Sequence, residues 1–134
     1  MGASLRLELP AAPAEASAPP LTLRHRHLPG TSLITVGGEI DLTATGQLAR
    51  YVDRVRRPGD TVVFDLTGVS FMDCSGLRVL ISTAQRAAND DAGVRLAGVR
   101  GIPARLLQIV GLHALLPVYG TVEQALAANR PSTR

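Results

Sequence analysis

Hydrophobic and polar positions alternate along the chain with two different periods, which predict strands and helices in turn. Residues 21–28 alternate with the period of two that is typical of an edge strand, and residues 31–40 form a second β-rich run. The Pro29-Gly30 pair between them marks a turn. The first forty residues therefore predict a hairpin that follows a segment without such a pattern.

A change to helical spacing follows this hairpin. Residues 42–57 place Leu48, Val52 and Val55 on one side of a helix and charged side chains on the other. Residues 61–66 are a short apolar run rich in β-branched side chains, as in a central strand that is covered on both faces. The sequence therefore predicts an amphipathic helix and then a strand in the middle of a sheet.

The second half of the chain continues the alternation of helix and strand. Helical spacing returns after residue 76 and is followed by a strand at 94–99, a helix at 102–112, a weak strand at 115–120 and a last helix at 121–129. Pro103 suits the first turn of the third helix, Gly111 lies near its end, and Thr121 suits the N-cap of the last helix. The predicted order is β-β-α-β-α-β-α-β-α.

This order defines an α/β fold in one domain. Parallel neighbours need long crossover connections, and helices supply them, so we expect a mixed, mostly parallel sheet of about five strands covered by about four helices. A length of 134 residues suits a single domain. Residues 1–20 are rich in Ala and Pro and predict a flexible N-terminal tail, residues 21–128 the domain, and residues 129–134 a C-terminal tail.

Composition narrows the function classes. The formal charge is +3, but two Phe, two Tyr and no Trp leave few aromatic rings for stacking bases, which argues against direct nucleic-acid binding. Cys74 is the only cysteine, so the chain has no internal disulfide and fits a reducing compartment. No stretch approaches the roughly 18 apolar residues of a membrane span, and the N-terminus lacks a secretory apolar region. We expect a cytoplasmic protein without membrane contact, cofactor or metal.

The turn at residues 73–76, Asp-Cys-Ser-Gly, is the most informative short stretch. Its structural interpretation is that Asp73 caps the following helix, whose first turn holds Cys74 and Ser75. A hydrolase nucleophile at Ser75 is disfavoured, because the G-x-S-x-G elbow is absent.

The three histidines also give little support to catalysis or metal binding. His25, His27 and His113 have no spacing that assigns one of them to Ser75 as a base. A metal site built from His25, His27 and Cys74 lacks further ligands, and the two strand histidines are better explained as surface residues.

A third interpretation makes Ser75 a substrate. A hydroxyl in the first turn of a helix can accept a phosphoryl group, whose charge of about −1.5 to −2 the helix N-terminus tolerates. Gly76 would then let the active site of another protein approach the backbone closely. This turn would act as a switch.

Three blocks of the sequence carry a family resemblance. Residues 37–44 (GGEIDLTA), 62–81 and 102–126 resemble the STAS domain of bacterial anti-sigma factor antagonists, and the similarity extends over about residues 21–128. It implies a non-enzymatic regulator of transcription that binds an anti-sigma factor, itself a serine protein kinase, and so releases a sigma factor. It also implies partner switching in a phosphoprotein: the kinase modifies the chain, which then loses its partner, and a serine phosphatase reverses this.

Carried over by motif position, the phosphorylation site is Ser75. Cys74 stands where the family frequently has a second serine, which leaves Ser75 as the acceptor of the turn. The resemblance implies a partner-binding surface and a monomer or weak dimer. The residues expected at this surface are Asp41, Leu42, Asp73, Cys74, Gly76 and Arg78.

An alternative keeps the fold and changes the role. The chain would then be a STAS scaffold or regulatory subunit of a larger stress-signalling assembly. Gel filtration separates the two roles, since a very large complex favours the scaffold.

Overall fold

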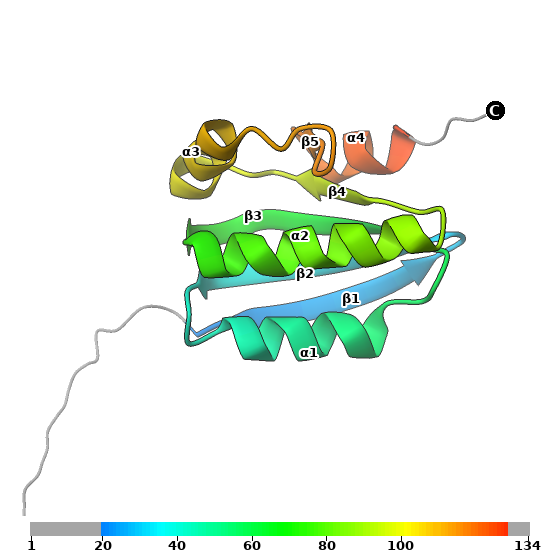
Figure 1. Cartoon of the computed structure of the whole chain (residues 1–134), viewed down its shortest axis with the longest axis horizontal. Helices are drawn as coiled ribbons and strands as arrows, with labels where there is room; N and C mark the ends of the chain where they lie inside the picture. Colours follow the sequence, from blue (N-terminus) through cyan, green and yellow to red (C-terminus); the bar gives the residue numbers. More distant parts are fainter. Residues whose placement is uncertain (1–19, 129–134) are drawn as a thin grey trace, which may run out of the picture.

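The computed structural model describes residues 20–128, which form five strands and four helices (Figure 1). The expectations for the two tails lie outside the described residues, apart from Pro20. The elements are β1 (Thr22–Leu28), β2 (Thr31–Ile40), α1 (Thr45–Val55), β3 (Thr61–Met72), α2 (Cys74–Asn89), β4 (Val94–Ala97), α3 (Gly101–Val110), β5 (Val118–Tyr119) and α4 (Val122–Ala127). This order confirms the predicted alternation.

The five strands make one sheet in the order β1-β2-β3-β4-β5. β1 and β2 pair as an antiparallel hairpin, and every other neighbouring pair is parallel. The mixed, mostly parallel sheet is therefore confirmed, with β3 in its centre as the apolar run predicted. Parallel pairing also brings the carboxyl ends of β2 and β3 to the same edge of the sheet.

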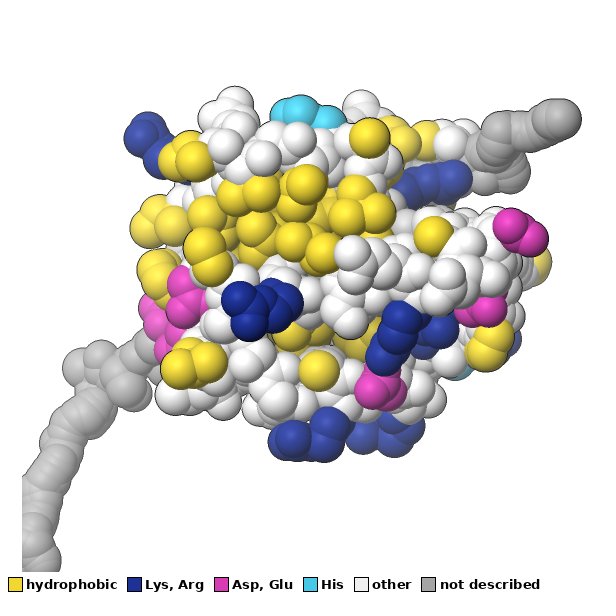
Figure 2. Space-filling view, viewed as in Figure 1, with side chains coloured by type: hydrophobic (Ala, Val, Ile, Leu, Met, Phe, Trp, Pro, Cys, Tyr) yellow, Lys and Arg dark blue, Asp and Glu magenta, His cyan; other side chains and the backbone are white. Residues whose placement is uncertain are grey.

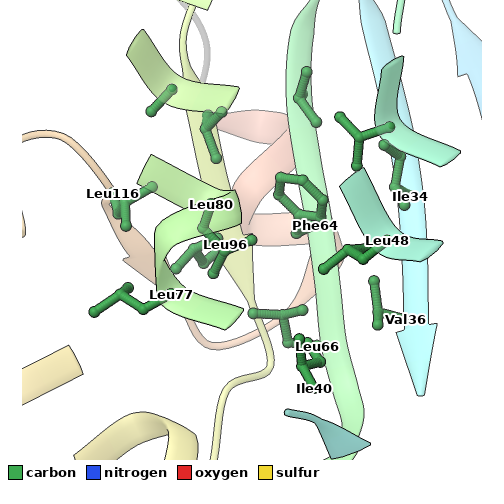
Figure 3. Close-up of a cluster of buried hydrophobic side chains, with 14 of the residues drawn as sticks. Ile34, Val36, Ile40, Leu48, Phe64, Leu66, Leu77, Leu80, Leu96 and Leu116 are labelled. Atoms are coloured by element: carbon green, nitrogen blue, oxygen red, sulfur yellow. The ribbon is translucent and has the colours of Figure 1, made fainter. Parts of the chain in front are cut away.

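The core lies on both faces of the sheet because side chains along a strand alternate between them. Phe64 of β3 packs with Leu48 of α1 and Leu80 of α2 in the larger cluster (Figure 3). Val63, its neighbour in the chain, belongs instead to a smaller cluster with Leu33 and Ala125 of α4. Thus β3 is covered on both faces, as its continuous apolar sequence indicated.

The predicted end of β3 at residue 66 is wrong. Thr67 and Gly68 have the character of a strand terminator, yet β3 continues to Met72 by pairing with β2 through two register shifts. These irregularities let the two strands stay paired to their ends, where Ile40 lies opposite Met72. The additional residues carry the chain to the edge of the sheet before it turns into α2.

Helix boundaries follow local capping rules. Gly111 ends α3 with a φ of +74°, a left-handed conformation that glycine adopts without strain. Thr121 caps α4, since its side chain accepts a hydrogen bond from the amide of Gln124. Both features were predicted from the sequence. Within residues 20–128, none of the helices has the length and apolar character that crossing a membrane requires.

Candidate functional site

Two acidic turns lie side by side where β2 and β3 end. Asp41 follows β2 directly and Asp73 follows β3, and the amide of Asp73 donates a hydrogen bond of 3.3 Å to the carbonyl of Ile40. The site is therefore assembled by parallel pairing, although its two turns are about thirty residues apart in sequence. Sequence analysis named both acids, and the structure brings them together.

Asp73 is the N-cap of α2, as the sequence predicted. Its Oδ1 accepts hydrogen bonds from the amides of Ser75 (2.9 Å) and Gly76 (3.2 Å) and from the hydroxyl of Ser75 (2.5 Å). The Ser75 hydroxyl is the main cause that lowers the pKa of Asp73; burial opposes it, and the amide hydrogen bonds add to the lowering. Asp73 thus holds Ser75 in one orientation as an ionised carboxylate.

The turn after β2 repeats this geometry. Oδ1 of Asp41 accepts from the amide of Thr43 (3.0 Å), the amide of Ala44 (3.2 Å) and the hydroxyl of Thr43 (2.6 Å). Sequence analysis singled out Asp41 but missed Thr43. The signal was present, because Asp41-Leu42-Thr43 and Asp73-Cys74-Ser75 share the pattern of an acid followed two residues later by a hydroxyl.

The residues around these turns differ in accessibility. Leu42 leaves 74% of its surface exposed, and Cys74 and Arg78 are also exposed, whereas Ser75 is partly buried. Ser75 is therefore not enclosed in the core, and it lines a surface groove. An exposed leucine beside an exposed arginine gives this surface both apolar and cationic character.

The surroundings of Gly76 differ from what the sequence predicted for this residue. It is buried, and a Cβ atom built on it would lie 2.7 Å from Cγ2 of Ile40 and 2.8 Å from both the Ile40 carbonyl oxygen and Cγ of Met72. The idea that Gly76 makes room for the active site of another protein is wrong, because residues of the same chain fill that space. The glycine lets α2 start close to the ends of β2 and β3.

Gly76→Ala is therefore expected to destabilise the domain by about 1–3 kcal/mol, because the added methyl group must displace a backbone carbonyl. Gly93→Ala is the matched control, since a Cβ at Gly93 would have no atom within 4 Å. Urea unfolding of both variants measures the difference. Equal stability of the two variants would contradict this account of Gly76.

A groove of about 350 Å³ runs between α1 and α2 beside Ser75. Leu42, Gly46 and Ala49 line one side of it. Ser75 and Arg78 line the other, and in the space-filling view basic side chains lie between the two helices, below an apolar area over α2 (Figure 2). Apart from Leu42, the α1 side of this groove was not predicted, because helix packing is not encoded in any local motif.

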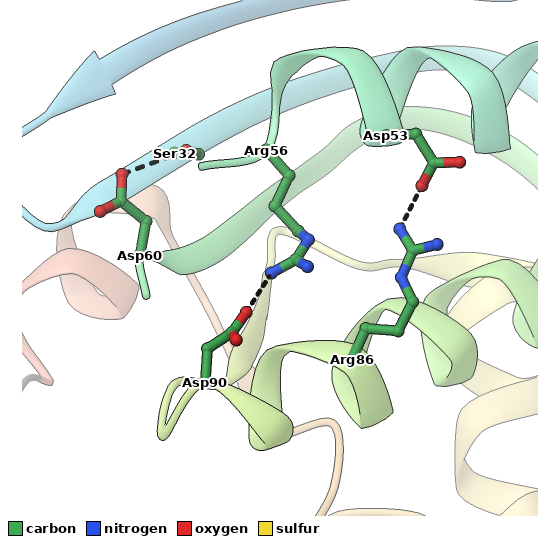
Figure 4. Close-up of polar contacts among 6 residues, drawn as sticks. All are labelled: Ser32, Asp53, Arg56, Asp60, Arg86 and Asp90. Atoms are coloured by element: carbon green, nitrogen blue, oxygen red, sulfur yellow. Dashed lines mark hydrogen bonds and ion pairs between the residues drawn. The ribbon is translucent and has the colours of Figure 1, made fainter. Parts of the chain in front are cut away.

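Ion pairs hold the two helices together away from Ser75. Arg86 of α2 pairs with Asp53 of α1, and Arg56, which follows α1, pairs with Asp90 at 3.3 Å (Figure 4). The first pair also lies at the groove wall. These ion pairs connect α1 to α2 at the end of the groove away from Ser75, while the buried side chains of Leu48, Val52 and Leu80 anchor the two helices to the sheet.

The two histidines of β1 make hydrogen bonds that connect β1 to α1. His25 Nδ1 hydrogen-bonds to the hydroxyl of Tyr51 (2.7 Å), and His27 Nε2 to the carbonyl of Val55 (2.8 Å). Neither makes a contact with Ser75, and His113 follows α3. No group of three His, Cys, Asp or Glu side chains in residues 20–128 is placed to hold a metal ion.

These features define a small α/β domain with a capped serine, Ser75, at the rim of a surface groove. Comparison with known proteins agrees: the model of the STAS domain matches residues 22–125. The chain belongs to the STAS domain family.

Named relatives come from several bacteria. The anti-sigma-B factor antagonist of Staphylococcus aureus is 30% identical over 86 residues, which are 63% of this chain and 80% of that protein. A Mycobacterium tuberculosis protein, provisionally named an anti-anti-sigma factor, is 37% identical over 98 residues; the match spans 70% of this chain and 66% of that protein.

The crystal structure of an anti-sigma factor antagonist from Mycobacterium paratuberculosis has a TM-score of 0.72 at 29% identity, covering 84% of this chain and 96% of that one. The names of these relatives describe regulatory binding proteins and not enzymes.

Proposed function

We propose that the chain is an anti-sigma factor antagonist. It binds an anti-sigma factor that is a serine protein kinase, and this binding releases a sigma factor for transcription in the bacterial cytoplasm. Phosphorylation of Ser75 ends the binding, and a serine phosphatase restores it. The relatives' names support the general role.

The observation that carries the switch is the position of the Ser75 hydroxyl. It lies in the first turn of α2, is oriented by Asp73, and lines a surface groove. A kinase can therefore reach it without unfolding the domain. The partner surface comprises the two turns and the start of α2, with Asp41, Leu42, Asp73, Cys74 and Arg78 as its members.

The chemistry of the switch is phosphoryl transfer in a partner's active site. Oγ of Ser75 attacks the γ-phosphorus of ATP held by the kinase, the new O–P bond forms, and the bond to the β-phosphate oxygen breaks as ADP leaves. A base in the kinase takes the hydroxyl proton. Removal of the phosphate is a separate hydrolysis in the phosphatase: water attacks the phosphorus, the Oγ–P bond breaks, Oγ of Ser75 takes a proton, and inorganic phosphate leaves. The chain itself supplies the substrate and catalyses neither step.

The test starts from capture of the partner kinase on the immobilised chain with ADP present. The purified kinase and ATP are then added to the full chain, and peptide mass spectrometry locates the phosphate. We expect it on Ser75. Thr43 is the internal control, because its hydroxyl has the same hydrogen-bonded turn at the same edge of the sheet. Phosphate on Thr43 instead, or on neither residue, would contradict the proposal.

A further inference from the structure

Arg78 is the cation nearest in sequence to Ser75 on the groove wall. Arg86, the other arginine that lines the groove, is occupied by its ion pair with Asp53. Arg78 is exposed, and within residues 20–128 no hydrogen bond or ion pair involves its side chain. Its guanidinium donors are thus available to an anion at this site.

Helix geometry directs Arg78 toward Ser75. The two residues are separated by three positions in α2, so their side chains lie on the same face of the helix. Side chains in a helix also tilt toward its N-terminus, which brings the long arginine side chain over the preceding turn. Both residues line the same groove, in agreement with this geometry.

Phosphorylation changes what Ser75 can do with Asp73. The hydroxyl now donates to Oδ1 of Asp73 at 2.5 Å, and a phosphate ester has no such proton. Two like charges would face each other where a hydrogen bond had been, while the amides of Ser75 and Gly76 still bond to Asp73. Repulsion from Asp73 therefore favours a phosphate rotamer that points toward the groove.

We propose that Arg78 binds the phosphate of phosphorylated Ser75 and is the phosphate-binding residue of the switched-off state. The inference rests on the proposed function for the origin of the phosphate. Arginine suits this role because its planar guanidinium presents paired donors to phosphate oxygens. The ion pair between Arg78 and the phosphate lies across the mouth of the groove. It engages a guanidinium group that the unmodified protein leaves available to its partner.

The test needs no kinase. Phosphoserine is incorporated at position 75 of the full chain during translation, and ³¹P NMR follows the phosphate through a pH titration. The second pKa of a phosphate ester is about 6. We expect Arg78 to lower it by about 0.5, because the arginine stabilises the dianion.

Three variants decide the outcome. Arg78→Gln is expected to raise the phosphate pKa relative to that of the phosphorylated parent, and Arg78→Lys to retain part of the lowering. Arg86→Gln is the matched control: it removes the same charge from the same groove wall, but about three helical turns away, and should change nothing. Circular dichroism and thermal unfolding verify that each variant is folded.

An identical phosphate pKa in the parent and Arg78→Gln proteins overturns the inference. An equal effect of Arg86→Gln also overturns it, because the lowering would then come from the general field of the groove. Since the phosphate is installed genetically, this failure is separate from that of the proposed function. A kinase that ignores Ser75 would refute that function and leave the NMR result intact.

Discussion

Ser75→Asp is expected to weaken binding to the partner kinase about a hundredfold, whereas Ser75→Ala keeps the affinity within a few-fold of the parent. A carboxylate at residue 75 stands against Asp73, close to Asp41, in a surface that must lose water on docking. A loss of roughly 3 kcal/mol suffices for this factor. Alanine adds no charge and only removes the hydroxyl.

Isothermal titration calorimetry with the captured kinase and ADP measures both variants. Thr43→Asp is the control for charge alone, since it adds a carboxylate at the same edge in a turn of the same geometry. We expect a smaller effect there, because Thr43 does not line the groove. Equal affinities of Ser75→Asp and Ser75→Ala would refute the electrostatic switch.

Phe64→Ala is expected to produce the largest loss of stability, about 3–5 kcal/mol, because it leaves a large cavity in the core. Phe64 has no exposed surface and lies in the first half of β3, on the face of the sheet that α1 and α2 cover. The loss is a large part of the total stability of a domain, which is about 5–15 kcal/mol.

The chain holds a matched control, because its other phenylalanine, Phe71, is only partly buried in the same strand. Phe71→Ala should lose clearly less stability in urea unfolding. Equal losses for the two variants would show that Phe64 is not the centre of the core.

The order of the elements and the type of sheet were predictable from the sequence. Buried apolar residues recur with one spacing in helices and another in strands, and both spacings are visible along the chain. Leu48, Val52 and Val55 lie on one face of α1, which packs on the core of the domain, and all three are buried. The end of β3 was not predictable in the same way. Thr67 and Gly68 resemble a terminator locally, and only pairing with β2 through register shifts keeps the strand extended. That pairing is a non-local property.

In the candidate site, too, the features set by local sequence were predictable and those set by contacts between distant residues were not. The cap of α2 by Asp73 follows from a local rule and was predicted, whereas the reason for Gly76 depends on Ile40, a residue of another strand. The groove required the packing of α1 on α2, which no short motif records. Arg78 was named from its position in a motif, but its lack of an ion-pair partner in the described chain is visible only in three dimensions.

Cys74 gives this architecture a practical property. It is the chain's only thiol, it is exposed, and it adjoins Ser75. A maleimide dye therefore labels one known position without any engineered cysteine, and its fluorescence reports on events at the first turn of α2. The same adjacency means that a bulky label blocks whatever docks there, so a small, environment-sensitive probe is the better choice for titrations.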